Sequence, residues 1–244
     1  MQSIFWTGRL LSRALRNGLA SISSAAELNV FNKKHPYLVS VVCGFPKDIA
    51  NGRTRKGQFG DDAWFATNFQ NADVIGSSTA CVMILDRNES LMRAANIGDS
   101  GYMVVRGGRV VYRSHEQQHY FNTPYQLSLP PPGHDRNVLS DRPESADTAE
   151  FPVECDDVIL VATDGVFDNV PEPVLVAEMR RAQGLAADPQ KLQSVANSIA
   201  WMARNLSFDG CYMSPFAKSA RQNGIDAIGG KPDDITVLLA IVAL

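Results

Sequence analysis

The strongest constraint on the fold is an unbroken succession of strand-like segments over residues 63–113, with no convincing helix among them. These short apolar runs contain many β-branched residues and are separated by glycine, asparagine and aspartate, a pattern typical of β-strands. Two of the runs flank Gly107-Gly108, which predicts a two-residue hairpin turn because glycine adopts positive φ without steric cost. This part of the chain is therefore expected to build antiparallel sheets.

The remaining segments add helices and further strands. Strands are expected at residues 37–43, 63–67, 78–85, 91–97, 102–106, 109–113, 158–163 and 235–242. Helices are expected at residues 172–183, 189–206 and 213–222, the second because its apolar residues recur near a 3.6-residue period. The proline-rich and then acidic stretch 124–157 is expected to be a long connection that is either functional or mobile. Strands first, helices later and a closing strand predict an α+β fold with mainly antiparallel sheets.

The composition excludes several classes of protein. At 244 residues, with 45% hydrophobic and 20% charged residues, the chain fits one sizeable globular domain or two small ones. A formal net charge of −3 provides no field that recruits nucleic acid, and no apolar run approaches the ~20 residues that span a bilayer. The cysteines have no CxxC spacing and are expected to be buried free thiols, which suits a reducing or organellar interior. They are Cys43, Cys81, Cys155 and Cys211.

The first 26 residues differ from the rest of the chain. They contain Arg9, Arg13 and Arg16 and several serines, and the first carboxylate is Glu27. An arginine-rich, serine-rich, acid-poor and amphipathic N-terminus is the pattern of an organellar transit peptide. An ordinary first helix with a basic face is the alternative. We favour targeting, and expect residues 1–26 to lie outside the fold.

Three acidic residues stand at the ends of expected strands. Asp62 lies in GQFGDDA before one strand, Asp164 follows VILVAT, and Asp233 precedes ITVLLAIV. Carboxylates at strand ends can converge on one rim of a sheet, where their mutual repulsion requires cations or protons. Oxygen-only ligands select hard ions such as Mg²⁺ or Mn²⁺. Each signature alone is better explained as a turn.

Four motifs in order give a more specific indication. They are GSSTACVMIL (76–85), ANIGDSGYMVVRGGRVVYRS (95–114), ATDGVFDN (162–169) and GGKPDDITVLL (229–239). Together they resemble the PPM-type, or type 2C, protein phosphatases. The resemblance runs from about residue 41 to the C-terminus, so residues 37–244 are expected to form the phosphatase domain. The stretch HEQQHYFNTPYQL and the N-terminus look most like the mitochondrial branch of that family, which implies a mitochondrial location.

The resemblance implies a fold and a mechanism. The family fold is a sandwich of two antiparallel sheets with helices on both outer faces, and the active site is a two-metal centre at one edge. Asp164 and Asp233 match metal-binding aspartates, and Asp62 matches the acid that holds the site through metal-bound water. The implied reaction is hydrolysis of phosphoserine or phosphothreonine in phosphoprotein substrates by a water that two Mg²⁺ or Mn²⁺ ions activate.

The phosphate-contacting arginine of the family lies just upstream of the early acid pair. Arg53, Arg55 and Lys56 cluster in that loop, but none has the expected offset from Asp62. A phosphate contact and a solvated basic loop are both compatible with this cluster.

One family segment is missing from the sequence. Family members carry an ADGVGGW-like segment and a helix pair before the GSSTA strand, whereas this chain reads NADVIGSSTA and contains no DGxGG. That motif supplies the carboxylate that bridges both metals, so the second ion is in doubt and one helical layer is expected to be depleted. The chain is therefore shortened near residues 72–78.

Two explanations of the shortening compete. The chain is either an incomplete product of a longer coding sequence or a catalytically weak or inactive relative that binds phosphoproteins. The abrupt junction between intact motifs favours the first explanation.

Two protease-like motifs are better explained by loops. His115–His119 reads HExxH, but an expected strand ends at Arg113 and Pro124 follows soon after, so a stable zinc-binding helix is not expected. The GDSG run at residues 98–101 lacks a suitable upstream histidine for a serine protease and is expected to be a turn between strands.

Overall fold

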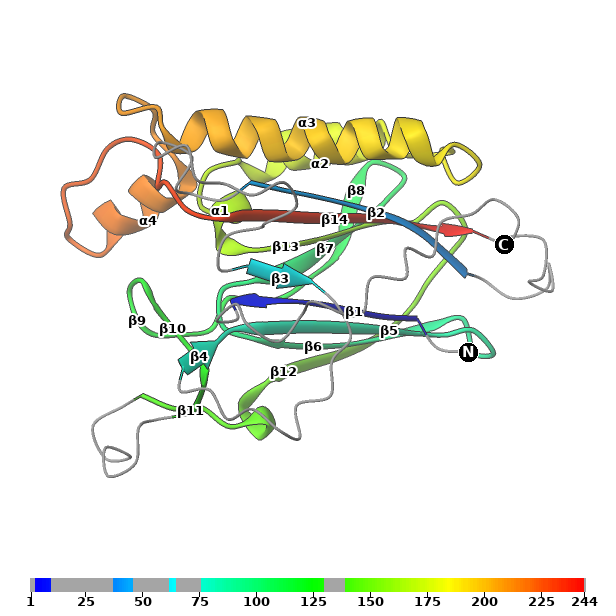
Figure 1. Cartoon of the computed structure of the whole chain (residues 1–244), viewed down its shortest axis with the longest axis horizontal. Helices are drawn as coiled ribbons and strands as arrows, with labels where there is room; N and C mark the ends of the chain where they lie inside the picture. Colours follow the sequence, from blue (N-terminus) through cyan, green and yellow to red (C-terminus); the bar gives the residue numbers. More distant parts are fainter. Residues whose placement is uncertain (1–2, 10–36, 46–61, 65–75, 130–138, 244) are drawn as a thin grey trace.

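The computed structural model describes residues 3–9, 37–45, 62–64, 76–129 and 139–243 (Figure 1). Its described part consists of two five-stranded antiparallel sheets, two short two-stranded ladders and a set of helices. This confirms the predicted α+β class with antiparallel sheets.

The inner sheet lies between the helices and the other sheet (Figure 1). Its strand order is β2-β14-β13-β7-β8, and every neighbouring pair is antiparallel. The strands are β2 (Tyr37–Phe45), β7 (Gly101–Arg106), β8 (Arg109–Arg113), β13 (Val158–Ala162) and β14 (Ile235–Ala243). The hairpin between β7 and β8 turns at Gly107 and Gly108, which both have positive φ, as the sequence predicts.

The outer sheet has the strand order β12-β6-β5-β1-β3, again with antiparallel neighbours. Its strands are β1 (Ser3–Arg9), β3 (Asp62–Trp64), β5 (Ala80–Asp86), β6 (Leu91–Ile97) and β12 (Asp147–Pro152). The short ladders pair β4 (Gly76–Ser78) with β11 (Leu127–Leu129), and β9 (Gln118–Tyr120) with β10 (Thr123–Pro124).

Four α-helices and one short 3-10 helix complete the described part of the chain. They are α1 (Asp164–Phe167), α2 (Glu172–Arg180), α3 (Pro189–Ser207), α4 (Pro215–Gln222) and the 3-10 helix Pro143–Ser145. Helix α3 begins after Asp188, whose side chain accepts a hydrogen bond from the backbone N–H of Lys191, and Pro189 occupies the first turn.

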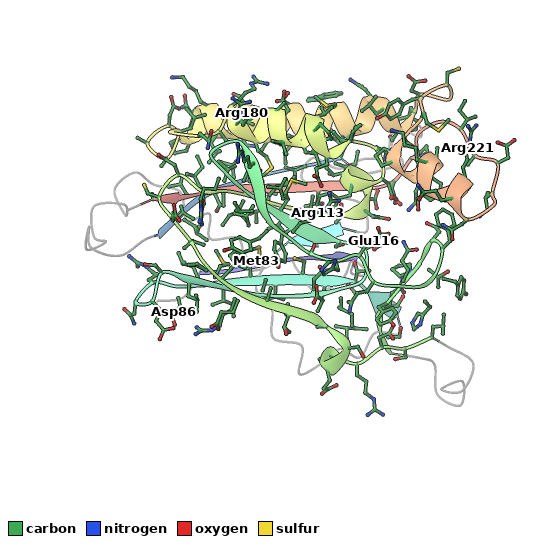
Figure 2. The ribbon with its side chains drawn as sticks, turned by 180° about the vertical axis from the view of Figure 1, so that it is seen from behind. Met83, Asp86, Arg113, Glu116, Arg180 and Arg221 are labelled. Atoms are coloured by element: carbon green, nitrogen blue, oxygen red, sulfur yellow. The ribbon has the colours of Figure 1, made fainter. Side chains whose placement is uncertain are left out.

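Strand β14 separates two hydrophobic cores. Side chains alternate between the two faces of a strand, and all nine residues of β14 are buried. Leu239 and Ile241 belong to the core shared with α1, α2 and α3, whereas Leu238 and Ala240 belong to the core between the two sheets. The second core includes Met83 of the outer sheet, which Figure 2 shows between the two layers. Burial on both faces explains the continuous apolar run of this strand.

The helices gather on one side of the molecule. Figure 1 shows α2 and α3 along the face of the inner sheet, with α1 and α4 at one end. Among the described residues, no α-helix covers the far face of the outer sheet. On that face Arg93 pairs with Asp86, Glu89 and Glu150 on a largely solvent-accessible surface. The α-helices of the described part thus lie on one side of the sandwich, and the depletion of the second helical layer stays a prediction.

Several elements differ from the expectations. The stretch 124–157 contains the strand β12, which pairs with β6 over its whole length, and is therefore more ordered than predicted. Besides the closing proline, only Ala149 and Phe151 of β12 are apolar. Its acidic residues and that proline hide the strand from a propensity argument.

The N-terminal stretch also differs in part. Ser3–Arg9 forms β1, which pairs with β5 and β3. This segment is therefore part of the outer sheet, although residues 1–26 were expected to lie outside the fold. Its sequence SIFWTGR is rich in β-formers, which accounts for the strand. The transit-peptide prediction itself stays a prediction.

All four cysteines are free thiols, as expected. Their expected burial is confirmed for Cys81 only, because Cys43 is half-buried and Cys155 and Cys211 are exposed. No helix within the described ranges is long and apolar enough to cross a membrane.

Candidate active site

The carboxylates of Asp164 and Asp233 lie at the same edge of the inner sheet because β13 and β14 are antiparallel neighbours. Ala162, near the end of β13, pairs with Val237, near the start of β14. Asp164, just after the end of β13, and Asp233, just before the start of β14, therefore lie at the same edge of the sheet. Beyond the strands, the backbone N–H of Thr163 donates to the carbonyl of Thr236 at 3.2 Å. The predicted convergence of these two aspartates is confirmed.

Gly165 allows the two segments to approach closely. A Cβ atom at this position would lie 2.2 Å from the carbonyl oxygen of Asp234, nearer than any real Cβ contact. The backbone after Asp164 thus lies directly against the backbone before β14. The close approach explains why glycine follows the aspartate in the DG motif: any side chain at this position would collide with the backbone of Asp234.

The ammonium of Lys231 joins three carboxylates at this edge. Its Nζ lies 2.6 Å from Oδ2 of Asp168, 3.0 Å from Oδ2 of Asp164 and 3.8 Å from Oδ2 of Asp233. Nζ also lies 5.1 Å from the ring centroid of Phe216 in α4, a cation–π contact. We call Asp164, Asp168, Asp233 and Lys231 the carboxylate–lysine cluster.

The cluster is largely buried, which changes its acid–base properties. Burial is the main cause that raises the pKa of Asp168 to about 7; the ammonium of Lys231 opposes this shift, and the charge of Asp164 adds to it. Burial alone would lower the pKa of Lys231, but the charges of Asp164 and Asp168 and hydrogen bonds to both raise it above its ordinary value. Lys231 therefore stays protonated at neutral pH.

Asn169 fixes the position of the loop that carries Lys231. Its fully buried side chain donates from Nδ2 to the carbonyls of Gly165 and Lys231, each at 2.9 Å. Its Oδ1 accepts from the backbone N–H of Lys231 at 2.8 Å. One side chain thus ties α1 to the segment before β14 with three hydrogen bonds.

Sequence reasoning missed Asp168, Asn169 and Lys231. Asp168 could have been found, because residues four apart lie on the same side of a helical turn and Asp168 is four after Asp164. Nothing local distinguishes Asn169 or Lys231, since their contacts join residues more than sixty positions apart.

A cavity of about 140 Å³ borders the cluster. Asp168 and Lys231 line it on one side, and Arg113, Glu116, Phe121 and Phe216 line it elsewhere. Arg113 pairs with Glu172 and lies over the ring of Phe167 at 5.5 Å. Figure 2 shows Arg113 and Glu116 near each other at the end of the molecule where α1 and α4 lie.

The other predicted site residues are placed only in part. The backbone of Asp62 begins β3, opposite Arg9 of β1, and β3 lies close to β14. Arg53, Arg55 and Lys56 lie outside the described residues.

Neither protease-like motif forms the structure that its protease would need. Gln118–Tyr120 is a strand, so His115 and His119 do not share a helix, and His119 instead pairs with Asp141 at 3.0 Å. Gly98, with φ of +96°, begins the bend between β6 and β7, which confirms the GDSG run as a turn.

Comparison with known proteins identifies the family. No family model matches the chain. The human protein phosphatase PTC7 homolog is 39% identical over 304 residues, covering 100% of this chain and 99% of that protein. The Danio rerio protein of the same name has the same identity and coverage. The chain belongs to the PPM-type protein phosphatases.

A solved structure supports the same family. The photosystem II phosphatase PBCP is 29% identical, with a TM-score of 0.58 over 68% of this chain and 64% of that one. The predicted sandwich fold and the family resemblance are thereby confirmed.

The PPM-type relatives are longer than this chain. The alignment with the human relative spans 304 residues, whereas this chain has 244, so at least 60 aligned positions have no counterpart here. The two sequences nevertheless match from end to end.

The cluster suits a hard cation in donor type and charge. All its acceptor atoms are carboxylate oxygens, the ligands that Mg²⁺ and Mn²⁺ prefer, and a cationic group already lies among them. These oxygens, however, are arranged around the ammonium of Lys231, at 2.6–3.8 Å from its Nζ atom. Within the ranges that the structure describes, no three carboxylate, histidine or cysteine side chains are arranged to hold a metal ion.

Proposed function

We propose that this chain acts on phosphoserine and phosphothreonine in phosphoproteins as a metal-dependent phosphatase, with the carboxylate–lysine cluster at its active site. The observation that carries the proposal is the meeting of Asp164 and Asp233 at one sheet edge, around one cationic group. Membership of the PPM-type family supplies the reaction class.

Asp164 and Asp233 would hold Mg²⁺ or Mn²⁺, and Asp62 would join them from β3. When bound, the ion would supply Lewis-acid stabilisation of the charge that develops on the phosphate and activation of the attacking water. The contribution of the protein is to position these carboxylates. Asn169 fixes the loop before Asp233, and Gly165 lets the segment after Asp164 lie against it. Both contacts limit motion at the edge, as preorganised sites require.

The substrate phosphate needs positive charge near the cluster. Arg53, Arg55 and Lys56 are proposed to supply it, on the basis of their position upstream of Asp62 in the sequence. The cavity beside Asp168 and Lys231 gives the rest of the substrate room at the same edge.

A weak or inactive phosphatase-fold protein is the second candidate. It is favoured by the absence of DGxGG from the sequence and by the outer sheet, whose far face carries no α-helix in the described part. The 60 or more unmatched positions of the human relative are enough for that motif and a helix pair. We propose that the gap lies near residues 72–78 and that this chain is an incomplete product rather than a long-diverged inactive relative.

The test is Mn²⁺-dependent release of phosphate from a phosphoserine peptide. The chain as it stands is compared with a version in which a DGVGG-containing segment of a relative is inserted before Gly76. We expect a rate in the inserted version that is at least about a hundredfold higher, since removing a catalytic group typically costs on the order of 10²–10⁴ in rate. Equal rates in the two versions would show that the missing segment does not limit catalysis. If neither version released phosphate, the proposal that this chain is a phosphatase would be wrong.

Mitochondrial localisation is proposed from the arginine-rich, acid-free N-terminus and the resemblance of the HEQQHYFNTPYQL stretch. A fluorescent protein fused to the C-terminus of the full chain is expected to enter mitochondria. The same fusion with Arg9, Arg13 and Arg16 changed to glutamate should stay outside them. Identical distributions of the two fusions would contradict targeting by this stretch.

A further inference from the structure

The side chain of Lys231 is held from several directions. Its ammonium is within 3.0 Å of the carboxylates of Asp164 and Asp168, and Asp233 lies 3.8 Å away. The ring of Phe216 lies on a further side at 5.1 Å. The side chain is 19% exposed. A lysine with this many partners is fixed far more strongly than one in an exposed ion pair.

The backbone of Lys231 is equally restrained. Asn169 hydrogen bonds to both its N–H and its carbonyl. One residue earlier, a Cβ on Gly230 would lie 2.0 Å from the carbonyl oxygen of Leu206, so the loop packs tightly on the end of α3. The hydroxyl of Ser214 donates to the carbonyl of Gly229 at 2.7 Å. The ammonium is therefore placed among the carboxylates by the fold.

The ammonium and a divalent ion cannot share this position. Metal–oxygen distances for Mg²⁺ are about 2.0–2.1 Å, whereas the carboxylate oxygens of the cluster stand 2.6–3.8 Å from Nζ. An ion held by Asp164 and Asp233 would have to draw these oxygens inward. It would also repel a positive charge only a few ångströms away.

We propose that Lys231 is an internal counter-ion that occupies the cation position beside Asp164, Asp168 and Asp233 and is displaced when Mg²⁺ or Mn²⁺ binds. The lysine keeps the carboxylates together in the metal-free protein, and its displacement lowers the affinity for the ion. This inference rests on the proposed function, because it requires the cluster to bind the ion.

The first test compares Mn²⁺ affinities by isothermal titration calorimetry. Lys231→Met removes the competing charge, and Lys191→Met is the control, because Lys191 is exposed and pairs only with Asp188 in the described ion pairs. We expect Lys231→Met to bind Mn²⁺ at least about tenfold more tightly, which is about 1.4 kcal/mol, with Lys191→Met unchanged. An unchanged or weaker affinity in Lys231→Met would overturn the inference.

The second test uses the unmodified chain, so it does not depend on the folding of a variant. Lysines are acetylated with and without Mn²⁺, and the modification of Lys231, Lys191 and Lys218 is measured by mass spectrometry. Lys231 should be protected without the ion and several-fold more reactive with it, while the other two stay the same.

The outcomes separate this inference from the proposed function. Binding of Mn²⁺ without any change in the reactivity of Lys231 would overturn the displacement and leave the metal-dependent function intact. Absence of Mn²⁺ binding from both the unmodified chain and Lys231→Met would overturn both.

Discussion

Replacing Asn169 with alanine is the sharpest test of how the active-site edge is held. The substitution removes three hydrogen bonds of 2.8–2.9 Å, one to Gly165 in α1 and two to Lys231 in the loop before β14. It leaves the carbonyl of Gly165 and both backbone groups of Lys231 without these partners. Asn169 has no exposed surface, so water cannot readily replace its amide.

The expected loss follows from these contacts. A net contribution of about 1 kcal/mol per hydrogen bond gives a loss of roughly 3 kcal/mol in the free energy of unfolding, and any polar group left buried and unpaired increases it. This is a large share of the 5–15 kcal/mol typical of a folded domain.

The assay is urea unfolding followed by circular dichroism, with Asn223→Ala as the matched control. Asn223 is exposed and donates only to the carbonyl of Ser219 among the side-chain bonds described. We expect the control to lie within about 0.5 kcal/mol of the unmodified chain, as exposed substitutions usually do. A loss below about 1 kcal/mol in Asn169→Ala would refute the claim that this side chain anchors the edge.

Three further substitutions or reactions test separate parts of the structure. Gly165→Ala should destabilise the fold by about 2 kcal/mol in the same urea assay, because the new Cβ would overlap the carbonyl of Asp234; a neutral effect would contradict the close approach. Arg106→Ala should cost about 3 kcal/mol, because it leaves the fully buried carboxylate of Asp157 without its paired guanidinium, and thermal unfolding would show a lower midpoint. The thiol of Cys81 should resist a maleimide at pH 8 while the exposed cysteines react, because burial raises its pKa to about 12; rapid labelling of Cys81 in the folded chain would contradict its burial.

Much of the fold could be predicted because its strong elements are locally determined. The observed bounds of β6 and β8 equal the expected ones. The Gly107-Gly108 turn marks the start of β8, and an apolar run marks β6 in sequence. Strand β14 was predictable because it is buried on both faces and therefore apolar throughout. Strand β12 was not, because it is an edge strand that depends on pairing with β6 rather than on its own composition.

The active-site edge was predictable only where residues flank core strands. Asp164 and Asp233 each follow or precede such a strand, so their meeting could be inferred from the sheet alone. Lys231 and Asn169 could not be found in this way, because a lysine in a glycine-rich loop and an asparagine after a helical turn are ordinary in sequence. Their roles arise from contacts between segments that only the folded chain brings together.

The most direct test of the central claim is calorimetric Mn²⁺ binding to two single variants, Asp164→Asn and Asp233→Asn. Each keeps the size of the side chain but removes the charge of one of the two proposed metal ligands at the edge of the inner sheet. If both carboxylates hold the same ion, each variant should bind Mn²⁺ at least about tenfold more weakly, or about 1.4 kcal/mol. Full Mn²⁺ affinity in either variant would contradict a shared cation site.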